Sequence, residues 1–226
     1  MDMATTQNAE IIWREGAPIS AQYDDPYYSL ADGLAEARHV FLAGNGLPDR
    51  FRIGFHIAEL GFGTGLNAIA ALQAWRQSGV AGVLKFTSFE AWPVTATDME
   101  RALAHWPELE PEASLLCDAW ASGARQITLA DFALEVIVGD ARETVPRWKA
   151  RADAWFLDGF SPSKNPELWE TDLIHAVADH TAPTGTCATY SAAGHVRRAL
   201  GAAGFEVQRC DGFGRKRHMT TGRLSP

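Results

Sequence analysis

Three glycines at alternate positions follow an acidic residue in the stretch Glu59-Leu60-Gly61-Phe62-Gly63-Thr64-Gly65-Leu66-Asn67. Glycine lets the backbone turn sharply and approach a ligand closely, and the free amide hydrogens at the start of a following helix attract electron-rich groups. Dinucleotide sites usually carry the spacing G-x-G-x-x-G, which places a pyrophosphate on the helix end. The spacing here is G-x-G-x-G, so the turn predicts a ligand site and weakens the case for a dehydrogenase.

Acidic residues stand at or near the ends of four consecutive predicted strands. Glu59 lies at the end of the first, and Glu90, Asp140 and Asp158 follow at the ends of the next three. Ligands of open α/β sheets bind outside the carboxyl ends of the strands. Any one of these acids alone is explained more simply as a helix N-cap or a surface residue, whereas four of them at one edge favour a binding site.

The elements that must position these residues are strands that alternate with helices. We expect strands over residues 53–60, 83–89, 132–138, 152–157 and 185–190, helices over 66–77, 95–105, 167–181 and 193–203, and a last strand pair over 205–209 and 217–222. Strands separated by segments of helix length predict an α/β fold with a mostly parallel sheet that is covered on both faces.

Two segments fall outside this alternation. Residues 1–50 are expected to form an N-terminal extension packed on the main domain, residues 51–226. Residues 106–131 are expected to form an insertion that ends in a hairpin partner for the strand at 132–138. Such segments often shape substrate sites, and extra packing is an equally good explanation.

Composition excludes several classes of protein. With 226 residues, 46% of them hydrophobic and 21% charged, the chain can bury one sizeable core and does not have the composition of a disordered protein. Its apolar runs are far shorter than the roughly 18 residues of a membrane span, and its start lacks a secretory signal, so we expect a cytoplasmic protein without membrane contact. No C-x-x-C or H-E-x-x-H motif occurs, so no metal site is expected.

The charge is unevenly distributed. A formal net charge of −8 argues against a nucleic-acid partner, but residues 195–226 hold seven basic side chains against two acidic ones, a local balance of +5. Binding to a polyanion depends on the charges that face it, so this basic end can still contact phosphates. From charge alone, a solvated surface is the simpler explanation.

The glycine turn resembles motif I of class I S-adenosylmethionine-dependent methyltransferases, which have a Rossmann-like fold with a mostly parallel seven-stranded sheet. The resemblance implies that Glu90 accepts hydrogen bonds from the ribose hydroxyls, that Asp140 lies near the adenine and that Asp158 faces the reacting methyl group. An acidic cleft also suits a cationic sulfonium, which carboxylates steer and hold. The cofactor-binding residues expected on this basis are Glu59, Gly61, Phe62, Gly63, Thr64, Gly65, Asn67, Glu90 and Asp140.

A longer set of strings carries a more specific resemblance. Residues 153–169 read DAWFLDGFSPSKNPELW, and together with residues 27–29, 33–34, 38–45, 59–67, 88–90, 191–198 and 212–217 they resemble the methyltransferase part of the MnmC-like tRNA 5-methylaminomethyl-2-thiouridine methyltransferase family. The resemblance implies N-methylation of 5-aminomethyl-(2-thio)uridine at the tRNA wobble position. Many members carry a C-terminal FAD-dependent oxidase. The chain stops before that half, so we expect no FAD and no oxidase activity here, and a separate oxidase is one possible source of the substrate.

The resemblance also assigns roles on the acceptor side. Asp158 is expected to have an ordinary carboxyl pKa near 3.9, to accept an N–H hydrogen bond and to orient the amine, while water carries the proton away. Phe160 is expected to stack on a flipped-out base, Lys164 to meet a phosphate, and Asn165 to read a base edge or, more simply, to cap the next helix. The expected contacts to the anticodon stem are Arg197, Arg198, Arg215, Lys216 and Arg217.

Two other functions remain open from the residues alone. Motif I says nothing about the acceptor, so an N-methyltransferase for a small molecule or a protein has the same donor site. A non-catalytic cofactor-binding module with a basic docking surface is the other alternative. Asp158 argues against it, because a pure binder needs no acid at the methyl end of the donor.

Overall fold

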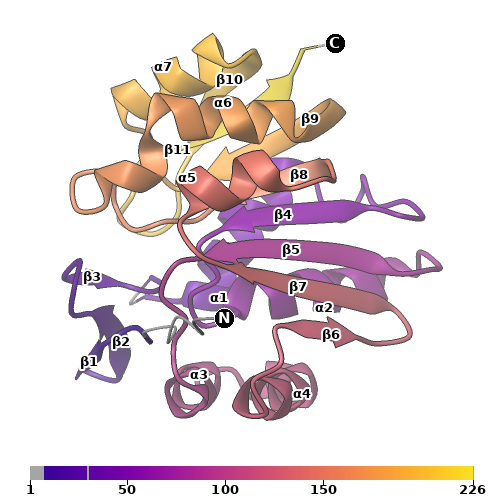
Figure 1. Cartoon of the computed structure of the whole chain (residues 1–226), viewed down its shortest axis with the longest axis vertical. Coiled ribbons are helices and arrows are strands. Elements are labelled where there is room, and N and C mark those ends of the chain that lie inside the picture. Colours follow the sequence, from indigo (N-terminus) through magenta and orange to yellow (C-terminus); the bar gives the residue numbers. More distant parts are fainter. Residues whose placement is uncertain (1–7, 30, 226) are drawn as a thin grey trace, which may run out of the picture.

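The computed structural model describes residues 8–29 and 31–225 and has a central eight-stranded sheet (Figure 1). Across the sheet the strand order is β10-β11-β9-β8-β4-β5-β7-β6. The inner strands β9, β8, β4, β5 and β7 are parallel, whereas β11 and β6 are antiparallel to their neighbours. The expected mostly parallel sheet is therefore confirmed, but it has eight strands and not the seven expected, because the end of the insertion adds β6 to one edge. Its strands are β4 (His56–Leu60), β5 (Leu84–Glu90), β6 (Gln126–Thr128), β7 (Phe132–Val138), β8 (Ala152–Leu157), β9 (Thr181–Thr189), β10 (Phe205–Asp211) and β11 (His218–Leu224).

The strand register brings the predicted site residues to one edge. Leu60 at the end of β4 pairs with Leu157 of β8 and with Phe89 of β5, and Glu90 pairs with Val138 of β7. Because parallel strands share one direction, the residues that follow them also meet at that edge. The turn after β4, Asp158 after β8 and Asp140 after β7 therefore surround one place in space.

Helices cover both faces of the sheet, as expected from the alternation of elements (Figure 1). Strand residues alternate between two cores: Ile57 and Phe156 face one, and Ala58 and Trp155 face the other. Helix α2 (Leu66–Ser78) lies on the first face together with α3 (Ala96–Leu103) and α4 (Glu110–Ala121). Helices α5 (Ala141–Thr144), α6 (Thr171–Asp179) and α7 (Gly194–Ala202) lie on the second. No helix in the described residues is long and apolar enough to cross a membrane.

The N-terminal segment forms a small sheet of its own. Strands β1 (Ile11–Arg14), β2 (Ala17–Ser20) and β3 (Asp25–Pro26) pair in that order, beyond the carboxyl ends of the main strands (Figure 1). Helix α1 (Gly33–Glu36) follows and continues into the π-helix Ala37–Leu42 and the 3-10 helix Ala43–Asn45. Leu34, Val40 and Phe41 are buried in the first core, so this segment is packed on the sheet.

Several elements differ from the expected bounds, among them the strand expected over residues 185–190, which is β9 and already begins at Thr181. The helix expected over residues 167–181 is split into the 3-10 helix Pro166–Trp169 and α6, because Glu170 between them has the extended angles φ −62 and ψ 145. The strand expected from residue 53 begins at His56, because the chain turns at Gly54 with a φ of 77°. The insertion contains the 3-10 helix Pro107–Leu109 and α4, and it ends in β6, which pairs antiparallel with β7 as expected.

Candidate active site

A cavity of about 1060 Å³ opens at the carboxyl ends of the parallel strands. This volume lies at the upper end of the range of small-molecule sites, which is roughly 300–1,000 Å³. Twelve of the residues expected from the sequence line it: Gly61, Phe62, Gly63, Thr64, Asn67, Glu90, Asp140, Asp158, Phe160, Asn165, Arg215 and Lys216. Six others are not among the lining residues: Glu59, Gly65, Lys164, Arg197, Arg198 and Arg217.

The glycine turn needs glycine for steric reasons. Gly61 has a φ of 85°, and a Cβ at this position would collide with the carbonyl oxygen of Asp158. Gly65 has a φ of 79°, and a Cβ there would lie 2.6 Å from the side chain of Leu116 in α4. Gly61 therefore lets β4 and β8 approach each other at the cavity, whereas Gly65 serves the packing of the turn against the insertion.

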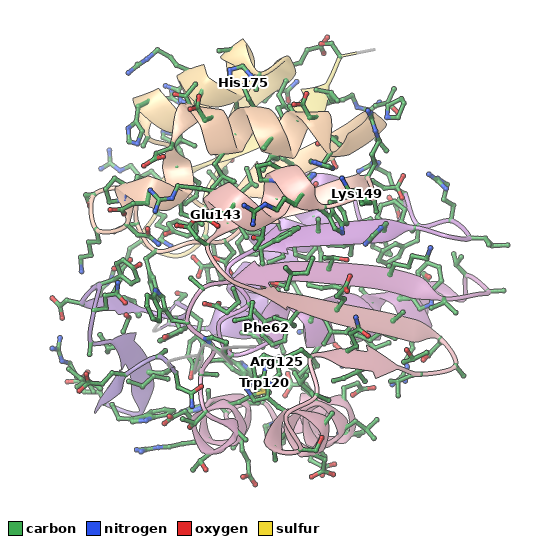
Figure 2. The ribbon with its side chains drawn as sticks, in the orientation of Figure 1. Phe62, Trp120, Arg125, Glu143, Lys149 and His175 are labelled. Carbon is green, nitrogen blue, oxygen red and sulfur yellow. The ribbon has the colours of Figure 1, made fainter. Side chains whose placement is uncertain are left out.

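Phe62 belongs to the same packing. Its side chain is 3% exposed and stacks on Trp120 of α4, with ring centroids 5.0 Å apart. The guanidinium of Arg125 lies 3.8 Å from the centroid of the Trp120 ring, so the three side chains form one stack (Figure 2). The insertion thus packs against the glycine turn through Trp120 and Leu116, which gives the segment at 106–131 a structural role at the cavity.

Glu59 lies behind the cavity wall and is fully buried. Its carboxyl group accepts hydrogen bonds from Asn67 Nδ2 at 2.9 Å and from the Ser88 hydroxyl at 2.7 Å. Burial raises the pKa of Glu59 well above its usual value, and the nearby Asp158 raises it further. Glu59 can therefore act on a ligand only through Asn67, which does line the cavity.

Asp158 faces the cavity and is held by the same amide. Asn67 Nδ2 donates to Asp158 Oδ2 at 2.6 Å. Burial raises the pKa of Asp158 to about 7, and the negative charge of Glu36 adds to this, while the Asn67 hydrogen bond and the charge of Lys216 act in the opposite direction. The expectation of an ordinary carboxyl pKa for Asp158 is therefore wrong, because the sequence does not show how deeply the strand end is buried.

Glu90 and Asp140 form the opposite side of the turn. Glu90 accepts backbone N–H bonds from Gly63 at 3.0 Å and from Trp92 at 2.8 Å, and burial raises its pKa despite these bonds. Asp140 caps α5 by accepting from the Arg142 backbone N–H, and it also pairs with the Arg142 guanidinium at 2.6 Å, which lowers its pKa. We call Gly61 to Asn67, Glu90, Asp140 and Asp158 the strand-end wall.

The strand-end wall fits the ligand that the sequence motif implies. The Glu90 carboxylate lines the cavity and is held in place by backbone N–H groups such as those of Gly63 and Trp92, so it can accept hydrogen bonds from ribose hydroxyls. Asp158 has no cationic side chain within ion-pair distance among the described residues, so it is free to face a cation or an amine. Asp140 could contact an adenine amino group only if Arg142, whose side chain is 42% exposed, turns away.

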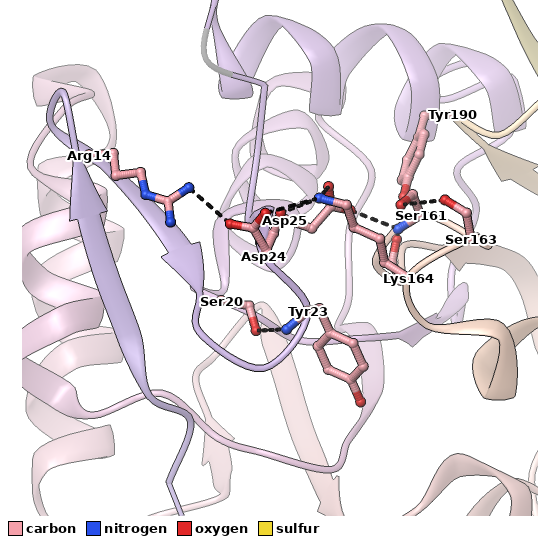
Figure 3. A network of polar contacts seen from close by, with 10 residues as sticks. Arg14, Ser20, Tyr23, Asp24, Asp25, Ser161, Ser163, Lys164 and Tyr190 are labelled. Atoms are coloured by element: carbon pink, nitrogen blue, oxygen red, sulfur yellow. Dashed lines mark hydrogen bonds and ion pairs between the residues drawn. The ribbon is translucent and has the colours of Figure 1, made fainter.

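The other side of the cavity comes from the N-terminal segment and from the loop after β8. Phe160 packs between Tyr23 and Tyr27, with ring centroids 4.9 and 5.1 Å away. Asp25 accepts the backbone N–H of Ser161 at 2.8 Å (Figure 3). Stacking of Phe160 on a base would require these tyrosines to move, since they occupy its neighbourhood here.

Lys164 and Asn165 differ from what their positions suggest. Lys164 forms ion pairs with Asp25 at 3.3 Å and with Asp24, and its ammonium also donates to the Asp24 carbonyl, so it ties the loop to the small sheet (Figure 3). Asn165 stands at the N-cap position of a 3-10 helix, but its side chain makes no capping hydrogen bond. The simpler explanation of Asn165 as a side-chain cap is therefore wrong, and it remains a buried residue of the cavity lining.

The basic residues near the C-terminus are divided in the structure. Lys216 turns into the cavity and pairs with Glu36 at 3.0 Å, while Arg215 also lines the cavity and Arg217 does not. Arg197 and Arg198 lie on α7, where Arg198 is exposed and the buried Nε of Arg197 has no hydrogen-bond partner in the described residues. We call Tyr23 to Asp25, Glu36, Phe160 to Asn165 and Tyr190, together with Lys216, the loop wall.

Sequence reasoning missed several residues of the loop wall, of which Glu36 and Tyr190 matter most for the chemistry. Glu36 is 7% exposed within α1, and Tyr190 follows β9 with its hydroxyl donating to the Gly159 carbonyl at 2.6 Å. Glu36 had no local signal, because an acid in a short helix is usually a solvated residue. Tyr190 directly precedes residues 191–198, one of the strings that carry the family resemblance, so its place at a strand end was a usable signal.

Comparisons with known proteins bear on this site. Residues 107–225 match a family model described as S-adenosyl-L-methionine-dependent methyltransferase. Relatives from Chromobacterium violaceum and Caulobacter vibrioides, 45% identical over 229 residues and 47% identical over 224, are both named tRNA 5-methylaminomethyl-2-thiouridine biosynthesis bifunctional protein MnmC. The matches cover 96% and 95% of this chain, which spans 35% and 38% of the two relatives. The crystal structure of MNMC2 from Aquifex aeolicus matches with a TM-score of 0.77 and 27% identity, over 99% of this chain and 73% of that one.

Proposed function

Since this chain belongs to the S-adenosyl-L-methionine-dependent methyltransferase family, we propose that it N-methylates 5-aminomethyl-(2-thio)uridine at the wobble position of tRNA. The names of the relatives support the RNA substrate and the position of the reaction in 5-methylaminomethyl-2-thiouridine synthesis. The same names describe bifunctional proteins. They fit an oxidase step that supplies the amine, on this polypeptide or on a separate one.

The observation that carries the proposal is the position and ionisation of Asp158. A carboxyl group with a pKa of about 7 is both a usable proton acceptor at neutral pH and a weak enough acid to pass the proton on. An alkylammonium has a pKa of about 10.4, so at neutral pH almost none of it carries the lone pair that methylation needs. Asp158 is closer in pKa to this amine than an ordinary carboxyl group would be.

The residues of the chain have distinct tasks in this reaction. Bound S-adenosylmethionine supplies the electrophilic methyl group. Glu90, the amides of the glycine turn and Asp140 would hold this cofactor, and Asn67 fixes the orientation of Asp158. Asp158 would take a proton from the acceptor ammonium, which would free the nitrogen lone pair to accept the methyl group that the cofactor gives up from its sulfur. The burial that raises the pKa of Asp158 also limits the access of water to the nitrogen.

Mass spectrometry of nucleosides tests the proposal. The protein is incubated with methyl-labelled cofactor and with tRNA that carries 5-aminomethyl-2-thiouridine, and the tRNA is then digested. We expect label in 5-methylaminomethyl-2-thiouridine with the wild type and almost none with Asp158→Asn. Label in small amines but not in tRNA would favour an N-methyltransferase for small molecules. Cofactor binding without transfer to any acceptor would favour a binding module.

A further inference from the structure

One lysine of the basic C-terminal loop points inward, into the cavity. The ammonium of Lys216 lies 3.0 Å from Glu36 Oε1 and 3.6 Å from the centroid of the Tyr190 ring. The Glu36 side chain is only 10% exposed, while the Lys216 side chain is 44% exposed. Of the three adjacent basic residues, Lys216 alone pairs with an acid among the described residues, although a loop that served only to bind a polyanion would gain nothing from holding one of its charges against a carboxylate.

The place that holds this ammonium is built by other contacts. The second oxygen of Glu36 accepts the Ser29 backbone N–H at 3.1 Å, so the carboxylate keeps its position without Lys216. Tyr190 is held by the bond from its hydroxyl to the Gly159 carbonyl. A buried carboxylate beside the face of an aromatic ring is a general arrangement for binding alkylammonium groups.

Asp158 belongs to the same region of the cavity. Gly159, whose carbonyl anchors Tyr190, is its direct neighbour in the chain. The charges of Glu36 and Lys216 are both close enough to act on the ionisation of Asp158, in opposite directions. An ammonium seated on Glu36 and Tyr190 therefore lies near the group that would accept its proton.

We propose that Glu36, Tyr190 and Asp158 form the subsite for the primary alkylammonium of the acceptor, and that Lys216 occupies this subsite until the acceptor displaces it. The inference rests on the proposed function, because it names the part of that site which recognises the substrate amine. A lysine side chain ends in the same –CH₂–NH₃⁺ group as a 5-aminomethyl substituent, so one subsite suits both. Its carboxylates and ring select a cation over a neutral substituent of the same size.

Binding measurements on nucleosides test this subsite without methyl transfer. The probes are 5-aminomethyluridine and 5-hydroxymethyluridine, which differ in one charged group, and their affinities are measured by calorimetry with wild type, Lys216→Met, and the double variant Lys216→Met/Glu36→Gln. We expect Lys216→Met to bind the amino nucleoside about fivefold more tightly than the wild type, because an internal competitor worth about 1 kcal/mol is gone. Its affinity for the hydroxymethyl nucleoside should not change.

The double variant and a surface lysine complete the experiment. We expect Lys216→Met/Glu36→Gln to lose most of the preference for the amino nucleoside, since Gln keeps the acceptor for Ser29 but loses the charge, while Asp158 and Tyr190 remain. Lys149 is exposed and lies outside the cavity, so Lys149→Met should match the wild type (Figure 2). The inference is overturned if Lys216→Met binds the amino nucleoside no more tightly than the wild type, or if the full preference for the amine survives the added Glu36→Gln change.

The result separates the subsite from the proposed function. If the protein shows this binding pattern but does not methylate tRNA, the ammonium subsite is supported and the proposed tRNA substrate is contradicted. If the protein methylates tRNA but does not show the pattern, the proposed function is supported and the subsite is contradicted.

Discussion

The two walls of the cavity are held in different ways. The strand-end wall follows buried parallel strands, and its polar groups are fixed by short hydrogen bonds such as Asn67 to Asp158 at 2.6 Å. The loop wall is assembled from five separate stretches of the chain and is joined by ion pairs at the surface, where Lys164 is 38% and Asp24 is 68% exposed. Exposed pairs contribute about 0–1 kcal/mol and weaken with salt.

This difference separates a rigid side from an adjustable one. Under the proposed function the strand-end wall faces the cofactor, which is the same in every reaction cycle, so a fixed geometry lowers the cost of binding it. The loop wall faces the acceptor, which is a macromolecule under the proposed function and has to enter and leave. Weak ion pairs allow such a wall to open at small energetic cost.

The largest effect is expected for Asp158→Asn, which changes the charge of the strand-end wall and not its shape. We expect kcat for methyl transfer to fall by about 10²–10⁴, the usual contribution of a general base. Turnover at the wild-type rate would contradict the role of Asp158 as proton acceptor.

The same variant should gain stability. The pKa of Asp158 is raised to about 7 in the folded state, so the contribution of this group to stability is greatest where it is protonated in both states, below about pH 3.8. This contribution is lost as the pH rises from there through 7. Since Asn67 can still donate to the new amide, Asp158→Asn should unfold at a higher temperature than the wild type at pH 8, and the difference should shrink at pH 5. If the variant and the wild type have the same melting temperature at pH 8, burial of the charged Asp158 carboxylate does not destabilise the protein.

Gly61→Ala tests the steric closure of the strand-end wall. The new Cβ would meet the Asp158 carbonyl at a φ of 85°, and we expect a loss of about 1–3 kcal/mol in the free energy of unfolding, measured with urea. Gly79→Ala is the matched control, because Gly79 has a φ of 70° and no atom within 4 Å of its Cβ position. If both variants lose the same stability, backbone strain alone explains the effect and the contact with Asp158 does not matter.

The pH dependence of kcat/KM reports the free protein and therefore the raised pKa. We expect the rate to rise with pH through an apparent pKa near 7. The charged groups that face Asp158 are Glu36, Glu59 and Lys216. Lys216→Met should move the midpoint to higher pH, because it removes the positive charge that favours the carboxylate. A midpoint near pH 4 in the wild type would show that Asp158 has an ordinary carboxyl pKa and would contradict the prediction.

The smallest effects are expected in the loop wall. Lys164→Ala removes ion pairs worth at most about 1 kcal/mol, so hydrogen exchange at the amides of residues 161–165 should speed up by up to about fivefold at low salt. At high salt the wild type should approach the variant. Arg14→Ala is the control, since Arg14 pairs with Asp24 on the far side from the loop (Figure 3). If hydrogen exchange at these amides is as slow in Lys164→Ala as in the wild type, the packing of Phe160, and not the ion pairs, keeps the loop in place.

The exposed arginines test RNA contact through salt. We expect Arg215→Ala/Arg217→Ala to reduce the slope of log affinity for tRNA against log salt by about 2. An unchanged slope would remove both residues from the RNA-binding surface.

The sequence predicted the strand-end wall better than the loop wall, for a physical reason. Glycine spacing and acids at strand ends are local patterns, and parallel pairing brings them together without further information. The loop wall depends on contacts between residues far apart in sequence, such as Lys164 with Asp25 and Lys216 with Glu36. Periodicity and charge place these lysines at a surface, so the sequence assigned them to phosphates and did not show their acidic partners.

The ionisation of Asp158 could not be read from the sequence either. A pKa depends on the depth of burial and on neighbouring charges, and Glu36 reaches Asp158 only through the fold. The split of the helix expected over residues 167–181 is a similar case, because the extended angles of Glu170 have no unambiguous signature in the residues around it.

The side-chain amide nitrogen of Asn67 donates hydrogen bonds to two acids, Glu59 and Asp158. If the side-chain amide were rotated by 180°, its oxygen, which cannot donate a hydrogen bond, would face both carboxyl groups. The two acids therefore fix the orientation of the amide. A substitution at position 67 therefore alters the surroundings of both carboxyl groups at once. Under the proposed function, the strength of the base at position 158 can thus be changed from Asn67, the second residue of α2, without altering the acid itself.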